Sequence, residues 1–301
     1  MTDHASDNPD DGPLAGLLTA LDLTDTGART SEDISTGPSQ WMPMGRVFGG
    51  QVLAQSLVAA MRTTEADRRP HSMHGYFLRP GDVTKPITFS VDRIHDGRSF
   101  STRRTQAYQD GRPILSMIAS FQDADEGLEH QAPMPEGIPE PESLPSARDV
   151  LSRIDHPVAA HWANDRPFDM RHVEQPVYFG AAPDRVAHQA VWIRAIGRLP
   201  DDPAVHLASL AYASDYSILE SIYRRHGLSW ATPGIKAASL DHAMWFHRFG
   251  RADEWMLYVQ ESTSAQGGRG LSLGRIYSRD GVLLASVAQE GMVRVPAQPR
   301  D

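Results

Sequence analysis

The chain has 301 residues, of which 40% are hydrophobic, and it carries a formal net charge of −9. This length accommodates two domains of about 150 residues, each large enough to bury a core. The acidic balance gives no general attraction to nucleic acid or to an anionic membrane, so we expect neither as a partner. A sequence without cysteine excludes disulfides, thiolate metal sites and a cysteine nucleophile.

The N-terminal residues show no pattern typical of a helix or a strand. Residues 1–12 are rich in Asp, Asn, Gly and Pro without periodic apolar positions, so we expect a loose tail. Neither a signal peptide nor a membrane-length apolar run is recognisable, which predicts a cytoplasmic location. Leucines then recur at helical spacing and predict a short amphipathic helix that ends near Asp22.

The first half reads as one helix followed by an antiparallel meander. The pair Gly49-Gly50 opens a helical pattern whose small residues make the helix thin, so other elements can pack closely around it. The Asp-Gly pairs 96–97 and 110–111 are hairpin signals. The strands are expected at 72–78, 87–94, 99–108 and 114–121.

A change of composition divides the chain. Five prolines stand among acidic residues between 133 and 145. Proline at this density disfavours regular structure and is typical of an extended linker. We therefore expect a linker over residues 126–166, with one domain over 1–125 and a second over 167–301.

The second half repeats the plan of the first. A helical region is predicted from Val205 to about Arg225, and strands are predicted at 191–196, 237–246, 255–262, 271–277 and 282–293. Arg79 precedes Arg248 by 169 residues, and Asp110 precedes Asp280 by 170. A series of matches at nearly constant offset predicts an α+β protein made of two copies of one fold, each with a long helix against an antiparallel sheet.

Two apparent motifs carry little weight. The segment from Gly270 to Gly274 matches the G-x-S-x-G of serine hydrolases, but it runs into a strand, and no histidine follows His247 to complete a triad. Ser272 is therefore not expected to be a nucleophile. The histidines lack metal-ligand spacing, so we expect no metal and no cofactor.

Three polar residues stand in otherwise apolar segments. Asp215 lies among aromatic and small residues, where partial desolvation would raise the pKa of its carboxyl and suit it to general-base work. A helix cap at Ser214 or Asp215 explains the same residues equally well. Ser239 and Gln289 lie within apolar strands and are weak candidates on spacing alone.

Longer motifs around these residues resemble a known family. The second half resembles the acyl-CoA thioesterase II (TesB-like) family, which has a double hotdog fold, and the first half continues the likeness. The resemblance is carried by the segments 46–51, 74–82, 211–215, 239–248 and 287–291. It covers nearly all of the chain except the tail and the proline-rich linker.

The resemblance implies a fold, an activity and a site. It implies a tandem hotdog, in which each repeat wraps a sheet around its central helix, and hydrolysis of fatty acyl-CoA of medium or long chain to free acid and CoA. The family's water-holding Asp, Thr or Ser, and Gln correspond to Asp215, Ser239 and Gln289. Family analogy also implies a homo-oligomer, a dimer or a tetramer of double-hotdog chains.

Two other functions remain open on the sequence. A hydratase or dehydratase on a hotdog fold would use a histidine with a carboxylate, and His74 or the Asp241-His242 pair offers one. A non-catalytic acyl-CoA binding protein would bind the thioester without releasing a thiol. The pair Asp241-His242 is interpreted as structural, or as positioning its strand and neighbours.

Overall fold

The computed structural model describes residues 12–26 and 32–296, and it confirms the α+β class. The helices are α1 (Pro13–Leu21), α2 (Gly49–Met61), η1 (Pro141–Ser143), α3 (Ala147–Leu151), α4 (Pro157–Asn164), α5 (Pro203–Ser214) and α6 (Glu220–His226). The strands of the first half are β1 (Thr24–Asp25), β2 (Asp33–Gly37), β3 (Arg69–Phe77), β4 (Ile87–Asp96), β5 (Phe100–Gln109) and β6 (Arg112–Gln122). Those of the second half are β7 (Phe168–His172), β8 (His188–Ala195), β9 (Lys236–Ser239), β10 (Asp241–Phe246), β11 (Met256–Gln266), β12 (Arg269–Ser278) and β13 (Leu283–Arg294).

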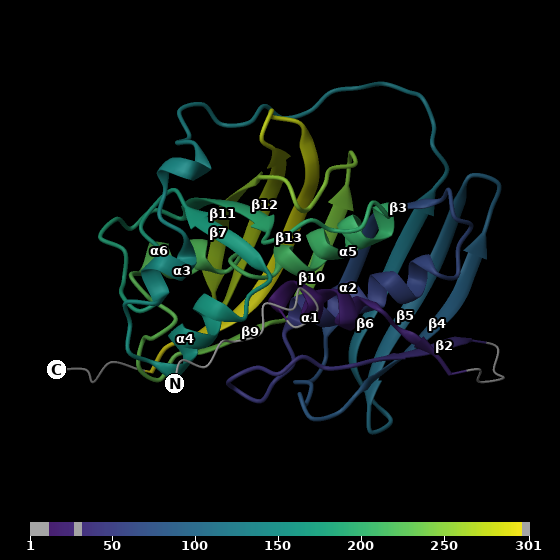
Figure 1. The fold of residues 1–301 in the computed structure, drawn as a ribbon, viewed down its shortest axis with the longest axis horizontal. Helices are drawn as coiled ribbons and strands as arrows, with labels where there is room; N and C mark the ends of the chain where they lie inside the picture. The colour runs from purple at the N-terminus through teal and green to yellow at the C-terminus, as the bar shows by residue number, and fades with distance from the viewer. Residues whose placement is uncertain (1–11, 27–31, 297–301) are drawn as a thin grey trace, which may run out of the picture.

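The strands form a 13-stranded antiparallel sheet that runs through both halves (Figure 1). Its order is β1-β2-β4-β5-β6-β3-β10-β13-β12-β11-β8-β7, and β9 pairs with β13 off this path. The halves meet where β3 pairs with β10, with Ala243 opposite His74. The hairpin turn at Asp110-Gly111 has positive φ at both residues, as its Asp-Gly sequence predicts.

Two helices meet inside the sheet. Helix α2 packs on β3 to β6 of the first half and also contacts α5 of the second half. The approach is close at Gly50, where an added Cβ would lie 2.3 Å from the carbonyl oxygen of Tyr212. The sequence predicted a thin helix around which other elements can pack closely, and the element in contact at Gly50 is α5.

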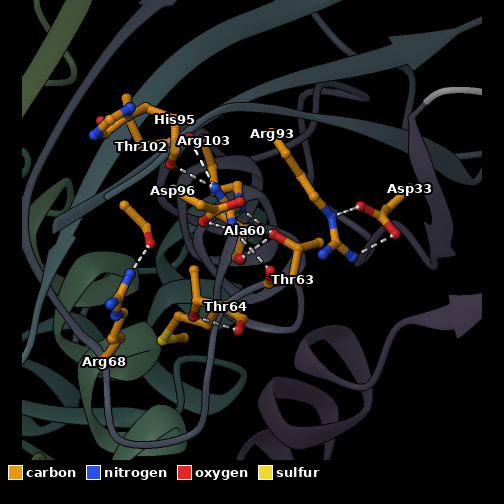
Figure 2. Close-up of polar contacts among 12 residues, drawn as sticks. Asp33, Ala60, Thr63, Thr64, Arg68, Arg93, His95, Asp96, Thr102 and Arg103 are labelled. Carbon is orange, nitrogen blue, oxygen red and sulfur yellow. Dashed lines mark hydrogen bonds and ion pairs between the residues drawn. The ribbon is translucent and has the colours of Figure 1, made fainter. Parts of the chain in front are cut away.

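The far end of α2 is fixed by a buried arginine (Figure 2). The side chain of Arg103, 2% exposed, donates hydrogen bonds to Thr63 Oγ1 at 2.8 Å, Thr63 O at 2.9 Å and Asp96 Oδ1 at 2.6 Å. Thr63 Oγ1 in turn donates to Ala60 O at 2.8 Å. These bonds tie the C-terminal end of α2 to the β4–β5 hairpin, which holds the helix in place while its glycine end faces α5.

The structure differs from the sequence predictions at several places, and strands β1, β2 and β7 were not predicted. The helix predicted from Val205 to Arg225 is wrong as one element, because it is divided into α5 and α6. The strand predicted at 237–246 is likewise divided into β9 and β10. The proline-rich segment has no helix or strand from 123 to 140 but contains η1, α3 and α4 further on.

These short helices begin at residues that favour helix starts. Pro157 occupies the first turn of α4, where a missing N–H costs nothing, and Ser146 and Asp149 form a capping box on α3. The boundaries of the linker and of the two domains stay a prediction. The expected tail falls, up to residue 11, outside the described residues. No helix in the described part of the chain is both long and apolar enough to cross a bilayer.

Candidate active site

Three separate elements bring Asp215, Ser239 and Gln289 together. Asp215 is the C-cap residue of α5, Ser239 ends β9, and Gln289 lies in β13. Gln289 Nε2 donates to Asp215 Oδ1 and to Ser239 Oγ, each at 2.9 Å. Ser239 Oγ donates to the same Asp215 oxygen at 3.3 Å. The three residues thus form one closed hydrogen-bonded triad, although they are far apart in the sequence.

The break between α5 and α6 positions Asp215. Ending a helix in the interior leaves polar backbone groups that need partners. Tyr258 of β11 donates its hydroxyl to Ser214 O at 3.0 Å, and Gln260 of the same strand donates to Ser217 Oγ at 2.7 Å. These hydrogen bonds from β11 stabilise the segment between α5 and α6, and Asp215 is the first residue of that segment.

An irregularity in the sheet positions Ser239. Ser239 lies opposite Gly291 whereas Ala243 lies opposite Ala288, so the pairing with β13 shifts by one residue between β9 and β10. Asp241 supports this shift, because its Oδ1 accepts the N–H of Glu290 at 2.7 Å. The role expected for Asp241, that of holding its strand and neighbours, agrees with this contact.

Burial makes the Asp215 carboxyl a weaker acid than usual. Desolvation raises the pKa of Asp215 to about 6, and the hydrogen bonds from Gln289, Ser239 and the backbone N–H of Gly50 lower the pKa in part. The carboxylate is therefore ionised at neutral pH but close to its titration range. This is the condition that suits a general base or acid near pH 7.

The N-terminus of α2 borders the other carboxylate oxygen. A Cβ on Gly49 would lie 2.6 Å from Asp215 Oδ2, so a residue with a side chain would press on the carboxylate. The first N–H groups of a helix have no partner within the helix and favour negative charge nearby. Glycine at this position allows Asp215 to approach these backbone groups directly.

A cavity of about 330 Å³ opens at Asp215 and Ser239. Most of its wall is aromatic or aliphatic, which suits an apolar ligand. Gln289 is 1% exposed and lies behind the two residues that face the cavity. Wall residues include Trp41, Phe48, Trp162, Tyr212, Tyr216 and Trp230. Trp162 comes from α4, in the segment predicted as linker, and no spacing in the sequence pointed to it.

His242 lies behind Gln289 and is fully buried. Its Nδ1 contacts Gln289 Oε1, and its Nε2 lies 3.0 Å from Ser214 Oγ. Burial lowers the pKa of His242 to about 4, against a smaller opposing effect of the Gln289 bond, so the ring is neutral at neutral pH. His74, the other candidate for a hydratase-type histidine, is exposed and packs edge-on against Trp245 instead of lining this cavity.

The G-x-S-x-G match is structural in this fold. Ser272 lies within β12, is fully buried, and its Oγ is 3.0 Å from Ser221 Oγ. A nucleophilic serine of that motif is exposed on a strand-to-helix turn, which Ser272 is not. Among the described residues, no three His, Asp or Glu side chains form a group that could hold a metal ion.

Comparison with known proteins agrees with the fold and identifies the family. The family model for acyl-CoA thioesterase matches residues 160–292, and that for the acyl-CoA thioesterase N-terminal domain matches residues 38–122. Acyl-CoA thioesterase 2 of Haemophilus influenzae is 38% identical over 87% of this chain and 92% of its own length. The chain therefore belongs to the acyl-CoA thioesterase family, whose members are hydrolases.

Solved structures give the same result. An acyl-CoA thioesterase II from Mycobacterium marinum has a TM-score of 0.76 and 40% identity, covering 95% of this chain and all of its own. A protein of unknown function with a hot dog fold from Alicyclobacillus acidocaldarius has a TM-score of 0.76 at 20% identity, covering 94% and 99%. The fold is thus the hot dog fold that the resemblance implied.

Proposed function

We propose that this chain hydrolyses acyl-CoA thioesters with a water molecule activated by Asp215, Ser239 and Gln289. The observation that carries the proposal is a carboxyl with a pKa of about 6 in the wall of an apolar cavity, hydrogen-bonded to a serine and a glutamine. A thioester is reactive enough for direct attack by a well-oriented water. No covalent intermediate on the protein is needed.

The proposed reaction balances with Asp215 as the proton carrier. Water attacks the thioester carbonyl carbon while Asp215 takes one of its protons. The C–S bond then breaks, and the CoA thiolate takes that proton from Asp215, which leaves the carboxylic acid and free thiol. Both N–H donors of Gln289 already point to Asp215 and Ser239, so Gln289 holds the triad together and the free lone pairs of the carboxylate contact the water.

The carbonyl oxygen becomes negative during this attack. The start of α2 lies beside Asp215, and the N–H of Gly50 already donates to the carboxyl. The N–H of Gly49, at the same helix start, is the group that we propose stabilises such an oxyanion. The apolar wall of the cavity supports the finer proposal that the acyl chain is of medium or long length.

Thiol release by purified protein tests the function. Because the chain contains no cysteine, a thiol reagent reports free CoA without background from the protein. We expect turnover across medium and long acyl-CoAs, and a fall in kcat of roughly 10² to 10⁴ for Asp215→Asn. Wild-type turnover in a folded Asp215→Asn protein would contradict the proposal.

The same assay separates the alternatives. A non-catalytic binder would show saturable acyl-CoA binding without thiol, and a hydratase would change the acyl chain without releasing CoA. The buried position of His242, with both ring nitrogens engaged, disfavours the hydratase. Ser272→Ala is expected to keep its activity, whereas a serine hydrolase would lose it.

We also propose that the two halves are two copies of one hotdog unit. The sheet order supports this. From the central pair β3 and β10, the strands continue outward as β6-β5-β4-β2 on one side and as β13-β12-β11-β8 on the other. On both sides the last strand of the half lies next to the central strand, and earlier strands follow in reverse chain order. Arg62 is the C-cap of α2 as Asp215 is of α5. A larger cavity of about 820 Å³ lies at the Arg62 end and contains none of the three proposed catalytic residues. Only one of the two related positions thus carries the triad.

A homo-oligomer, dimer or tetramer, also remains a proposal. Its support is the exposure of Tyr76 (64%), Ile118 (47%) and Trp245 (37%), which lie on the adjacent strands β3, β6 and β10. Light scattering on Trp245→Glu tests it, with a smaller assembly as the expected result. An unchanged mass would reject this surface. A cytoplasmic location stays a prediction.

A further inference from the structure

The side-chain amide of Gln289 has one productive orientation, and His242 is the residue placed to select it. We propose that His242 is a positioning residue, which holds the carbonyl end of Gln289 so that its NH₂ end faces Asp215 and Ser239. The inference rests on the proposed function, because it explains how that triad is kept in its working arrangement. His242 itself does not face the cavity and does not contact Asp215.

The orientation follows from counting donors and acceptors. Gln289 Nε2 lies 2.9 Å from both Asp215 Oδ1 and Ser239 Oγ, and Gln289 Oε1 faces His242 Nδ1. A reversed amide would place its carbonyl oxygen against the carboxylate, and two acceptors would then repel each other. An ionised Asp215 therefore requires the NH₂ end, and Gln289 Oε1 then requires a donor on its other side.

His242 supplies that donor only in one tautomer. A neutral imidazole carries its proton on one nitrogen, and a proton on Nδ1 leaves Nε2 as an acceptor. Ser214 Oγ lies 3.0 Å from Nε2 and 2.8 Å from Ala211 O, and its single proton can go to only one of these two acceptors at a time. The proposed tautomer requires the Ser214 hydroxyl to donate to Nε2 in preference to Ala211 O. The tautomer of His242 and the orientation of Gln289 are thus coupled.

The hydrogen bonds form a directed chain that returns to the place where it began. In the proposed arrangement Ser214 donates to His242 and His242 donates to Gln289, while Gln289 donates to Asp215, which directly follows Ser214 in the sequence. Tyr258 OH fixes the start of the chain by donating to Ser214 O at 3.0 Å. Ser214, His242, Tyr258 and Gln289 are all buried, so water cannot easily replace a missing member.

The protonation states of the groups around Asp215 bear on how its titration affects activity. These groups are the N–H of Gly50, Ser239, Gln289 and the rings of Tyr212, Tyr216 and Tyr258. Burial raises the pKa of all three tyrosines, so they stay neutral through pH 9. The pKa of His242 is lowered to about 4, below that of Asp215. The wall of the same cavity also carries His161, Asp165 and Arg166. The fall in activity near pH 6 is therefore assigned to Asp215 by its response to the substitutions of His242, which does not line the cavity.

A matched pair of amide substitutions tests the role. In His242→Asn the amide lies near the position of Nδ1 and can donate to Gln289. In His242→Gln the longer side chain carries the same amide to the position of Nε2, where it reaches Ser214 but not Gln289. The two variants thus differ in where the donor lies and not in its chemistry.

We expect His242→Asn to keep kcat within about threefold of the wild type, with its acid limb in place. We expect His242→Gln to lower kcat at least tenfold with KM changed less than twofold. Its acid limb should move to higher pH, because loss of the Gln289 N–H removes a bond that lowers the pKa of Asp215. Thermal melting verifies that both variants are folded.

Two results would overturn the proposal. One is equal behaviour of the two variants, either both like the wild type or both impaired with an unshifted acid limb. The other comes from NMR of ¹⁵N-labelled wild-type protein, with the His242 ring signals assigned by through-bond correlation from the backbone. A neutral ring protonated at Nδ1 is expected, and a ring protonated at Nε2 would contradict the proposal even if neither variant folds.

The experiments distinguish failure of the positioning role of His242 from failure of the proposed hydrolytic function. If Asp215→Asn keeps its turnover, the hydrolytic role of the triad fails whatever His242 does. If Asp215→Asn is inactive while His242→Gln keeps the kcat and acid limb of the wild type, only the positioning role fails.

Discussion

Gln289 Nε2 lies 2.9 Å from Asp215 Oδ1, although 74 residues separate them in the sequence. The contact joins the interrupted end of α5 to the last strand of the sheet. Burial is the largest influence on the acidity of Asp215, and the bond from Gln289 partly opposes the rise in pKa that burial produces. Catalysis and stability therefore both depend on the charge of this carboxyl.

The pH dependence of activity should follow Asp215. As a base the carboxyl must be ionised, so kcat/KM should fall as pH decreases through the pKa of about 6. Below that value we expect a loss of about tenfold per pH unit, down to the limit set by acid unfolding. Thiol release measured between pH 5 and 8 verifies this. An activity that is flat between pH 5 and 7 would exclude Asp215 as the base.

The same pKa makes the ionised Asp215 a cost to stability. The folded-state pKa of about 6 is above the ordinary aspartate pKa of 3.8, so the folded chain binds a proton that the unfolded chain releases between these pH values. The free energy of unfolding therefore decreases as pH rises through this window, by up to about 3 kcal/mol above pH 6.

Asp215→Asn should therefore be more stable than the wild type at pH 8. The amide carries no charge, so burying it does not lower the free energy of unfolding as the buried carboxylate does, and its oxygen can still accept a hydrogen bond from Gln289. Urea unfolding at pH 8 and pH 4.5 measures the effect, and the advantage of the variant should shrink at the lower pH. A variant that is less stable at pH 8 would mean that the hydrogen bonds outweigh the desolvation.

The elements that depend on local chemistry were predictable from the sequence. The hairpin between β5 and β6 turns at Asp110-Gly111, and both residues adopt the positive φ that this pair favours. Helix α1 ends at Leu21, as its leucine spacing predicts. The starts of α3 and α4 were also readable, from the Ser146 and Asp149 capping box and from Pro157, but proline density alone had suggested an extended linker.

The departures that shape the site depend on distant contacts. The helical pattern of the sequence continues past Ser214, yet α5 ends there. Tyr258 and Gln260, both in β11, stabilise this interruption of the helix by donating hydrogen bonds to it. The shift between β9 and β10 similarly depends on Asp241 reaching the N–H of Glu290. Residue spacing left Ser239 and Gln289 as weak candidates, and Asp215 as either a general base or a helix cap. The family resemblance named them together, and their catalytic role stays a prediction.

The hydroxyl of Ser239 is expected to matter more than the rest of its side chain. It donates to Asp215 and accepts from Gln289, so Ser239→Ala removes two contacts of the triad. We expect kcat to fall about tenfold, in line with the loss of about 1.4 kcal/mol of hydrogen bonding. Ser239→Thr keeps the hydroxyl and should stay within about threefold of the wild type. Equal kcat for the Ala variant and the wild type would remove Ser239 from the mechanism.

The two glycines at the start of α2 should separate activity from stability. A Cβ on Gly49 would lie 2.6 Å from Asp215 Oδ2 and 3.1 Å from two ring atoms of Phe77, all of them in side chains. Gly49→Ala should therefore displace the carboxylate and lower kcat at least tenfold, with a smaller loss of melting temperature than Gly50→Ala. A Cβ on Gly50 would lie 2.3 Å from the backbone oxygen of Tyr212, and only separation of α2 from α5 relieves that contact.

Gly50→Ala should accordingly destabilise the fold by about 1–3 kcal/mol or more, as overpacking of a close helix contact does. Melting temperature and kcat measured on both variants decide the matter. The expected pattern is a stable but impaired Gly49→Ala and an unstable Gly50→Ala. If Gly49→Ala instead keeps full activity, the carboxylate does not need its position against the start of α2, and the oxyanion role proposed for this helix end fails with it.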